Sequence, residues 1–380
     1  MSKLLKTNIL HITSVSFSLH YFIGEQFLYF RQKGYRFFVA CSPSEELASL
    51  AEQYRFDYIA TPIERKMSPW HDIQSLFAIA RYIRRQQIDI VVGHSPKGAL
   101  LAMLVARLCR VPKRIYFRHG LVYETAHGLK RFILQAVDRF TSRCATQVVC
   151  VSPSLMRKSL EDRLDNPAKQ ILLGAGTCGG IDTRGKYNPE HIEAQKLSAL
   201  RAQYVITDTD FVIGYTGRLV RDKGIMDLLD AFDRLPEDLH ARLLLVGPFE
   251  ERDALPQTAK QRILNDPRIV FTGLIHTGIE YFYAMMNVYV LASYREGFPI
   301  GALEAQAMQV PVVTTRETGC IDAIMEGQTG LFTTHAPADI ANIIMQTKRY
   351  PEMGAEGRKW VAANFDHLII WKHIEEIYQI

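Results

Sequence analysis

Hydrophobic residues in the first half of the chain form short β-type runs that alternate with amphipathic, helical patterns. The predicted strands are 8–13, 36–41, 58–61, 88–93, 113–117 and 147–151, and the predicted helices are 21–33, 45–54, 73–86, 98–108, 129–145 and 153–164. This alternation is typical of a parallel sheet covered by helices on both faces. The pattern therefore predicts a Rossmann-like domain at residues 1–185.

The same pattern begins again after a segment rich in glycine, residues 174–189, which reads as a linker. The second set of predicted strands is 211–216, 241–246, 269–272, 288–292 and 312–315, with helices at 225–235, 254–265, 280–286, 300–308 and 319–326. We expect a second Rossmann-like domain at 186–364 and a closing helix at 365–380 that packs on the first domain. Ligands of open α/β sheets bind at the carboxyl ends of the strands, so the predicted fold is two parallel sheets facing a central cleft.

Composition agrees with a soluble globular protein, because 48% of the 380 residues are apolar and 22% are charged. The longest apolar stretch, 98–106, is far shorter than the roughly 20 residues that a membrane-spanning helix needs. The first residues mix polar side chains into the apolar ones, which favours a buried strand over a signal peptide. The six cysteines include no C-x-x-C pair, so we expect reduced thiols and a cytoplasmic protein.

Charge is distributed unevenly between the two halves. Residues 1–190 contain 27 Lys and Arg against 15 Asp and Glu, a balance of +12, whereas residues 191–380 contain 18 against 25, a balance of −7. A basic half is compatible with nucleic acid, an anionic membrane surface or a phosphorylated substrate. A solvated surface without a partner is the alternative.

Two glutamates mark the most informative segment, Ser293 to Ala305. The chain turns at Gly297 and Pro299 after a predicted strand and then opens a helix, whose first backbone amides form an anion site. Glu296 lies before this helix and Glu304 inside it, and carboxylates accept hydrogen bonds from the vicinal hydroxyls of riboses and hexoses. An acidic helix start stabilised by the helix dipole would explain Glu296 but not Glu304.

A basic loop, residues 217–224, follows the first strand of the second domain and precedes a helix. Phosphate groups are usually bound at this position, and neither G-x-G-x-x-G nor G-x-x-x-x-G-K-[ST] occurs in the chain to bind them elsewhere. Arg218 offers a planar fork and Lys223 a point charge, which together balance a diphosphate. Taken alone, such a loop is equally compatible with a solvated surface.

These motifs resemble those of the family 4 retaining glycosyltransferases, which have the GT-B fold. The resemblance rests on the R-x-x-x-x-K loop, the E-x7-E segment and the strand order, and Tyr294-Arg-Glu-Gly-Phe-Pro is most similar to the bacterial capsule, O-antigen and glycan-assembly members. It implies that Glu296 contacts the donor sugar, that Glu304 binds the ribose, and that Arg218 and Lys223 bind the diphosphate. It further implies a base contact by Gly273, Leu274 and Ile275, and phosphate contacts in the turn Gly297, Phe298 and Pro299 and at the amides of Ile300, Gly301 and Ala302.

Histidine loops of the first domain extend the resemblance. His94-Ser-Pro-Lys97-Gly and His119-Gly are similar to the family's H-x-x-K-x-G and H-G loops. By that similarity His119 contacts the transferred sugar and joins Glu296, Arg218 and Lys223 as a catalytic residue. His94 and Lys97 then lie nearer the acceptor, although a single histidine is more often structural.

One departure from the family pattern concerns the loop after the first strand. Most members have a Gly-Gly pair there, whereas this chain has Thr13-Ser-Val-Ser16-Phe-Ser-Leu-His20. We expect Ser16 and His20 to contribute acceptor contacts in place of the glycine backbone.

The resemblance implies a hexosyltransferase that moves a hexose or N-acetylhexosamine from a UDP-sugar, with retention, to a polyprenyl-diphosphate-linked saccharide. The nucleotide-sugar is a co-substrate, and no metal or other cofactor is expected, because Asp208-Thr-Asp210 precedes its strand and reads as a turn. Basic residues among the apolar ones of the helices at 73–85 and 129–143 predict contact with an anionic membrane, on the inner face of the plasma membrane.

Two other functions are compatible with parts of the sequence. A nonhydrolysing UDP-sugar epimerase has the same twin-domain cleft but needs several carboxylates placed as acids and bases, and the arginine, lysine and glutamate pattern favours transfer. A nucleic-acid-binding protein would use the basic half, yet no helix-turn-helix, zinc finger or aromatic-basic repeat occurs in the chain.

Overall fold

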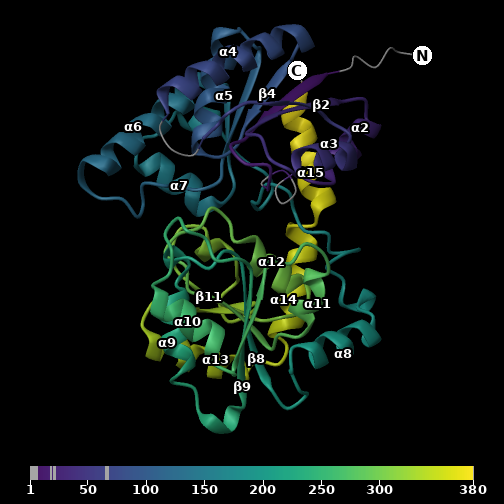
Figure 1. Ribbon diagram of the computed structural model, residues 1–380, viewed down its shortest axis with the longest axis vertical. Coiled ribbons are helices and arrows are strands. Elements are labelled where there is room, and N and C mark those ends of the chain that lie inside the picture. The colour runs from purple at the N-terminus through teal and green to yellow at the C-terminus, as the bar shows by residue number, and fades with distance from the viewer. Residues whose placement is uncertain (1–6, 18, 20–22, 65–67, 380) are drawn as a thin grey trace. The chain divides into compact units, whose positions relative to one another are not determined.

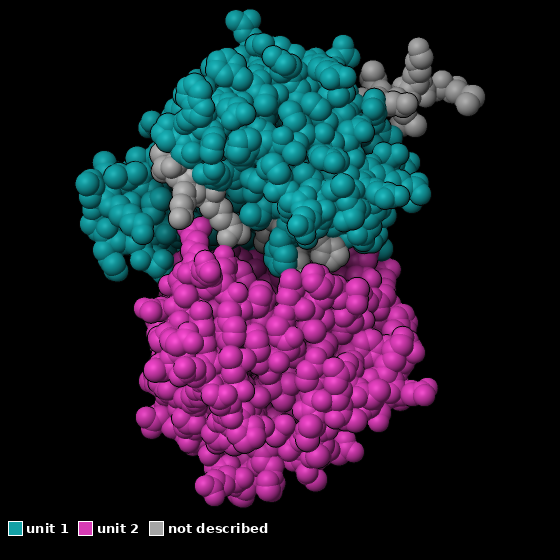
Figure 2. All heavy atoms as spheres, viewed as in Figure 1, with its two compact units in different colours: residues 1–179, 368–380 teal, residues 180–367 magenta. Residues whose placement is uncertain are grey.

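The computed structural model describes residues 7–17, 19, 23–64 and 68–379. The chain forms two compact units, residues 1–179 with 368–380 and residues 180–367 (Figure 2). The division between Gly179 and Gly180 falls within the glycine-rich segment, and the last residues belong to the first unit. Each unit is an α/β domain with one parallel sheet, which confirms the predicted fold class.

Among its described residues, the first unit contains a parallel sheet of seven strands in the order β3-β2-β1-β4-β5-β6-β7. Its strands are β1 (Asn8–Ile12), β2 (Arg36–Cys41), β3 (Asp57–Ala60), β4 (Ile90–Gly93), β5 (Lys113–Arg118), β6 (Gln147–Cys150) and β7 (Gln170–Leu172). Its helices are α2 (Gln26–Gln32), α3 (Leu47–Tyr54), α4 (Pro69–Gln86), α5 (Pro96–Leu108), α6 (Gly128–Cys144), α7 (Pro153–Glu161) and most of α15 (His367–Tyr378). Helices α4, α5 and α6 lie on one side of the sheet and α2, α3 and α15 on the other (Figure 1).

The second unit contains a parallel sheet of six strands in the order β10-β9-β8-β11-β12-β13. Its strands are β8 (Phe211–Thr216), β9 (Ala241–Val246), β10 (Ile269–Gly273), β11 (Val288–Leu291), β12 (Val312–Thr315) and β13 (Gly330–Thr333). Its helices are α8 (Ala194–Gln203), α9 (Ile225–Phe232), α10 (Gln257–Asn265), α11 (Ile279–Ala284), α12 (Ile300–Ala307), α13 (Pro337–Thr347) and α14 (Met353–Asn364).

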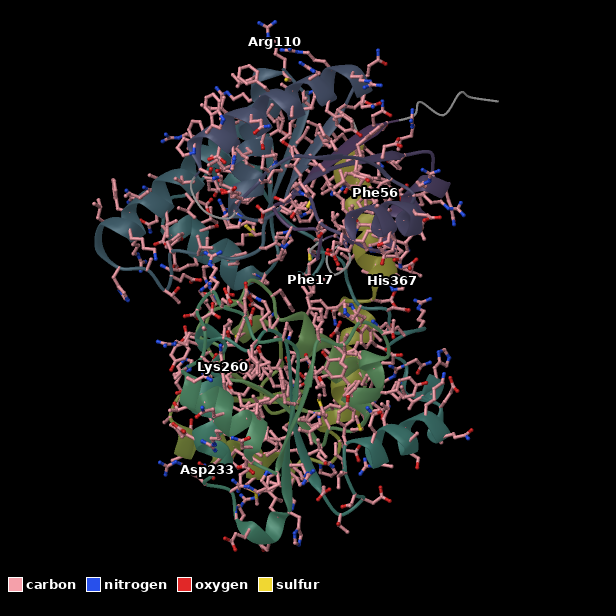
Figure 3. All side chains as sticks on the ribbon, in the orientation of Figure 1. Phe17, Phe56, Arg110, Asp233, Lys260 and His367 are labelled. Carbon is pink, nitrogen blue, oxygen red and sulfur yellow. The ribbon has the colours of Figure 1, made fainter. Side chains whose placement is uncertain are left out.

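The central strands of both sheets are buried on both faces, as their continuous apolar runs predict. Every residue of β4 and β11 is buried. In the first unit an aromatic cluster fills the space beside β1, with the Phe27 ring centroid 4.8 Å from that of Phe37 and 5.2 Å from that of Phe56, which is labelled in Figure 3. Burial of these faces supplies most of the free energy that holds each sheet together.

Several elements differ from the sequence-based expectation. The sequence patterns did not predict β7, β13, α8, α13 or α14. The predicted helix at 319–326 is instead a single 3-10 turn, Cys320–Asp322, because Gly327 adopts a left-handed φ of 74° and the chain leads into β13.

The strand order of each sheet reverses between two neighbouring strands, β1 and β4 in the first unit and β8 and β11 in the second. Loops that follow such strands leave in opposite directions, so the space above the strand ends is open to ligands. The predicted basic loop follows β8 and the segment with Glu296 follows β11. The fold therefore brings these two loops to one edge of the second sheet.

A glycine allows the loop after β8 to approach β11. Gly224 has a φ of 69°, and a Cβ atom added to it would lie 2.0 Å from the carbonyl oxygen of Ala292. Any side chain at this position would push the basic loop away from the strand.

No helix in the described part of the chain combines the length and the apolar character that crossing a bilayer demands.

Replacing Gly224 by alanine should destabilise the second unit more than replacing Gly327. Both glycines have a left-handed φ, but a Cβ atom at Gly327 would meet nothing within 4 Å. We expect G327A to lower the free energy of unfolding by about 1–2 kcal/mol, and G224A to lower it by about 2 kcal/mol more because of the steric overlap. Urea unfolding of both variants measures the difference, and equal losses would contradict the close approach at Ala292.

Candidate functional site

An ion pair connects the two loops at the edge of the second sheet. Lys223 ends a 3-10 turn, Arg221–Lys223, and its Nζ lies 2.6 Å from Oε1 of Glu296. The two side chains are only 14% and 15% exposed, so water screens their attraction less than at an open surface. A cation and a carboxylate, both with capacity for further hydrogen bonds, are thus held side by side.

Asp222 fixes the backbone of the glutamate loop. Its carbonyl oxygen accepts hydrogen bonds from the Tyr294 amide at 2.9 Å and from the Ser293 hydroxyl at 3.1 Å. Its carboxylate pairs with Arg295 at 2.8 Å. Gly319 packs so closely on the loop that an added Cβ atom would lie 2.7 Å from the Glu296 carbonyl oxygen. These contacts fix the loop of Glu296 in the absence of a ligand. Such preorganisation lowers the entropic cost of binding a ligand.

Arg218 lies at the other end of the basic loop and pairs with Glu250, which follows β9. Burial opposes the charged form of Arg218, but the hydrogen bond and charge of Glu250, together with the charge of Asp222, raise its pKa above the ordinary value. The Arg218 side chain is 43% exposed. It is therefore charged and accessible, and an anionic ligand would compete with Glu250 for it.

Glu304 lies in α12 with both carboxylate oxygens oriented by tyrosines. The Tyr187 hydroxyl donates to Oε1 at 2.5 Å and the Tyr283 hydroxyl to Oε2 at 2.6 Å. The Tyr283 hydroxyl is in turn 2.7 Å from the hydroxyl of Thr216 at the end of β8. Burial raises the pKa of Glu304, and the two phenol hydrogen bonds oppose that rise. Each oxygen retains a lone pair for a ligand hydroxyl.

The start of α12 packs directly on the end of β8. A Cβ atom added to Gly301 would lie 2.5 Å from the Tyr289 hydroxyl and 2.6 Å from the Thr216 hydroxyl. The Ala302 amide donates to the Pro299 carbonyl at 3.1 Å, so it reaches a ligand only if that bond breaks. Ile300 and Gly301 form the first turn of the helix.

The other residues expected to contact the donor are of two kinds: loop residues after β10, and Phe298, which is buried in the core. Gly273 ends β10 with a φ of 66° and accepts a hydrogen bond from the Gly247 amide at 2.9 Å, and Leu274 beside it is partly exposed. Ile275 follows in the same loop. Phe298, by contrast, is buried with its ring centroid 5.3 Å from that of Phe365, so its side chain stabilises the unit rather than facing a ligand.

The first unit brings three histidines together. His94 is buried after β4, with Nε2 3.0 Å from Nδ1 of His11 and Nδ1 3.0 Å from Nε2 of His119. Both nitrogens of His94 are therefore occupied within the protein. His119 follows β5 and is partly exposed.

Lys97 and Ser16, two of the other residues expected to contact the acceptor, pair with acidic side chains of the first unit. Lys97 is buried in the first turn of α5 and pairs with Asp72 at 2.7 Å. The Ser16 hydroxyl donates to Glu46 at 2.5 Å. His20 lies outside the described residues.

Asp208-Thr-Asp210 forms a turn before β8, as predicted, with the Thr207 amide donating to the Asp210 carboxylate at 2.7 Å.

Several residues that position the predicted side chains carry no functional signal in the sequence. Tyr187 lies in the glycine-rich segment taken for a linker, and Tyr283 and His11 lie in regular elements where they resemble core positions. Glu250 is the exception. It is an acidic residue just after β9, and β9 is the neighbour in the sheet of β8, whose following loop contains Arg218.

Comparison with known proteins gives two family matches. The model of the 4-like glycosyl transferases matches residues 9–152, and that of the group 1 glycosyl transferases matches residues 210–348. Each match falls within one of the two units.

Relatives match the chain over most of its length. The capsular polysaccharide biosynthesis glycosyltransferase CapM of Staphylococcus aureus is 30% identical over 376 residues, which are 97% of this chain and 96% of the relative. The N,N'-diacetylbacillosaminyl-diphospho-undecaprenol alpha-1,3-N-acetylgalactosaminyltransferase of Campylobacter jejuni is 22% identical and covers 82% of each chain. The crystal structure of Anabaena HepE in complex with UDP-glucose superposes with a TM-score of 0.80 at 19% identity, over 97% of this chain and 98% of HepE. Because of its fold, its loops and these matches, we conclude that the chain belongs to the family 4 glycosyltransferases.

Proposed function

We propose that this glycosyltransferase moves a hexose or N-acetylhexosamine from a UDP-sugar to a polyprenyl-diphosphate-linked saccharide, with retention at the anomeric carbon and without a metal ion. The observation that carries the proposal is the gathering of Arg218, Lys223, Glu296 and Glu304 at the point where the second sheet reverses its strand order. Transfer is favoured over an epimerase or a nucleic-acid-binding protein by the glycosyltransferase family matches.

The donor is assigned to the second unit on electrostatic grounds. Arg218 and Lys223 are charged side chains whose partners in the ligand-free chain are carboxylates, Glu250 and Glu296. A diphosphate carries negative charge in the same position and offers more acceptor oxygens, so it displaces Glu250 from Arg218. Glu304 then accepts hydrogen bonds from the ribose hydroxyls. The complex of HepE with UDP-glucose supports a uridine nucleotide as the donor.

Stabilisation of the leaving group supplies the catalysis in this proposal. As the bond from the anomeric carbon to the diphosphate breaks, negative charge grows on the diphosphate, and Lys223 and Arg218 are placed to stabilise it. Glu296 holds hydroxyls of the sugar, while His119 contacts the sugar from the first unit. No protein nucleophile is assigned, and the departing diphosphate accepts the proton of the acceptor hydroxyl.

Relatives and an exposed surface support a lipid-linked saccharide as the acceptor in this proposal. The Campylobacter relative carries diphospho-undecaprenol in the name of its acceptor. In the first unit, α4 and α6 expose large apolar side chains: Trp70 (78%), Phe77 (74%), Leu129 (75%) and Phe132 (62%). The same helices contain the basic residues Arg81, Arg84, Arg85, Lys130, Arg131, Arg139 and Arg143. Apolar side chains among basic ones suit the surface of an anionic membrane, on the cytoplasmic face where UDP-sugars are available.

A transfer assay tests the function directly. Purified protein is incubated with UDP-hexoses and UDP-N-acetylhexosamines, polyprenyl-diphosphate-linked saccharides and EDTA, and release of UDP and the anomeric configuration of the product are followed by NMR. We expect one donor to yield an α-linked product from an α-linked donor. An inverted product, or transfer that stops in EDTA, would contradict retention or metal independence, respectively.

Replacing Glu304 by glutamine should raise the donor KM at least tenfold. The amide preserves the volume and one acceptor oxygen but loses the charge and the second acceptor, and hydrogen bonds to charged groups contribute about 1.5–3 kcal/mol. Steady-state kinetics measures the KM. Glu326→Gln is the matched control, because Glu326 is an exposed partner of Arg316. An unchanged KM in E304Q, with a normal melting temperature, would remove Glu304 from the donor site.

Replacing Arg218 by alanine should weaken UDP about 10- to 100-fold, the range of one charge-assisted hydrogen bond. Uridine, which has no phosphate, should bind the variant and the wild type equally. Arg221→Ala removes the same charge from the same loop, but Arg221 is exposed and donates to the Ala254 carbonyl, so it serves as the control. Equal weakening of UDP in both variants would show that only the net charge of the loop matters.

Replacing Phe77 and Phe132 together by glutamate should abolish binding to anionic vesicles. The change removes two exposed apolar side chains and adds charge that anionic lipids repel. Co-sedimentation with phosphatidylglycerol vesicles at low and high salt measures the binding. Leu264→Glu is the control, because Leu264 is 62% exposed on α10 in the second unit. Equal binding of all three proteins would contradict a membrane surface on α4 and α6.

A further inference from the structure

Three imidazole rings of the first unit form a continuous hydrogen-bonded chain across the carboxyl ends of three neighbouring strands. His11 lies in β1, His94 follows β4 and His119 follows β5, and these strands are adjacent in the sheet. Each link measures 3.0 Å between nitrogens. Ring centroids are 5.2 and 5.3 Å apart, so the rings meet through their edges, where N–H groups point.

A phenol lies at the buried end of this row of hydrogen-bonded side chains. The Tyr378 hydroxyl on α15 lies 3.3 Å from Nε2 of His11. Both side chains are only 1% exposed, and the rings of Phe27 and Phe37 surround His11. Tyr378 and His11 are thus sealed in an apolar environment, whereas His119 at the other end is partly exposed.

All three histidines are neutral at physiological pH. Burial lowers the pKa of His11 to about 3 and that of His119 to about 4. Burial also places the pKa of His94 well below its ordinary value, helped by its two histidine neighbours. A neutral imidazole has one N–H donor and one acceptor nitrogen. The hydrogen bonds from His11 to His94 and from His94 to His119 must therefore both run in the same direction.

Tyr378 determines that direction. Burial raises the pKa of its hydroxyl, which therefore keeps its proton. In the described part of the chain His11 is the hydrogen-bond partner of this hydroxyl. If Tyr378 donates to His11, then His11 donates to His94, and His94 donates to Nε2 of His119. The opposite direction would leave the phenol proton buried without an acceptor, which is unfavourable.

We propose that Tyr378, acting through His11 and His94, holds His119 in the tautomer with its proton on Nδ1 and so makes His119 a hydrogen-bond donor to the sugar rather than a base. Contact with the sugar rests on the proposed function, whereas the tautomer does not. His11, His94 and Tyr378 are positioning residues in this arrangement. Nε2 of His119 accepts a hydrogen bond from His94 in this arrangement, so the single proton of the neutral ring is on Nδ1.

The tautomer is measured by two-dimensional NMR of the protein labelled with 15N-histidine, at pH 7, with His119 assigned from the spectrum of His119→Gln. We expect the wild type to show His119 protonated at Nδ1. Tyr378→Phe preserves the ring and removes the donor, so His119 should become a mixture of both tautomers. Tyr35→Phe is the matched control, because that ring lies 6.0 Å from Tyr378 in the same cluster. Protonation at Nε2 in the wild type, or an unchanged tautomer in Y378F, would overturn the proposal.

Kinetics separates this role from a purely structural one. With the donor and acceptor found in the transfer assay, Y378F should lower kcat about threefold to tenfold, the effect of one neutral hydrogen bond, and leave the donor KM unchanged. Y35F should change neither. A loss of kcat in both variants, or in neither, would overturn the link to catalysis. If the wild type transfers no sugar, the proposed function fails while the NMR result still tests the tautomer.

Discussion

The ion pair between Lys223 and Glu296 is the interaction on which the candidate site of the second unit depends. It connects the loop after β8 to the loop after β11, the two strands between which the sheet order reverses. Asp222 reinforces this connection through its hydrogen bonds to the glutamate loop and its pairing with Arg295. The pair holds a cation and a carboxylate side by side in the ligand-free protein. In the proposed function, a sugar hydroxyl binds to Glu296 and a phosphate oxygen to Lys223.

The two units gather different types of side chain at the carboxyl ends of their central strands. In the second unit, the switch point between β8 and β11 gathers charged side chains, which suits a diphosphate. In the first unit, the ends of β1, β4 and β5 gather neutral imidazoles, which suit the hydroxyl groups of a sugar. Burial explains the difference, since it keeps the histidines uncharged while the paired charges of the second unit retain partial access to water.

The charged loops and all strands of both sheets except β7 and β13 were predictable from the sequence, because those signals are local. Apolar runs mark buried strands, and Arg218, Lys223 and Glu296 follow strands directly. The partners of Glu304 were not predictable in this way, because Tyr187 is 117 positions away and no pattern links the two. Helix α14 was missed because glycine is a poor helix former, yet Gly354 is needed where an added Cβ atom would lie 2.0 Å from the Gln309 carbonyl. The roles assigned to His94 and Lys97 stay predictions, although both side chains are engaged within the first unit.

The most direct measurement of the central claim is calorimetric titration of the wild-type protein with UDP, GDP and ADP in the presence of EDTA. The central claim is that the second unit binds a uridine diphosphate through Arg218, Lys223 and Glu304 without a metal. It predicts heat of binding for UDP and at least tenfold weaker binding of GDP and ADP, as expected of a site that recognises the base by specific hydrogen bonds. No binding of any of the three, or equal binding of all, would contradict it.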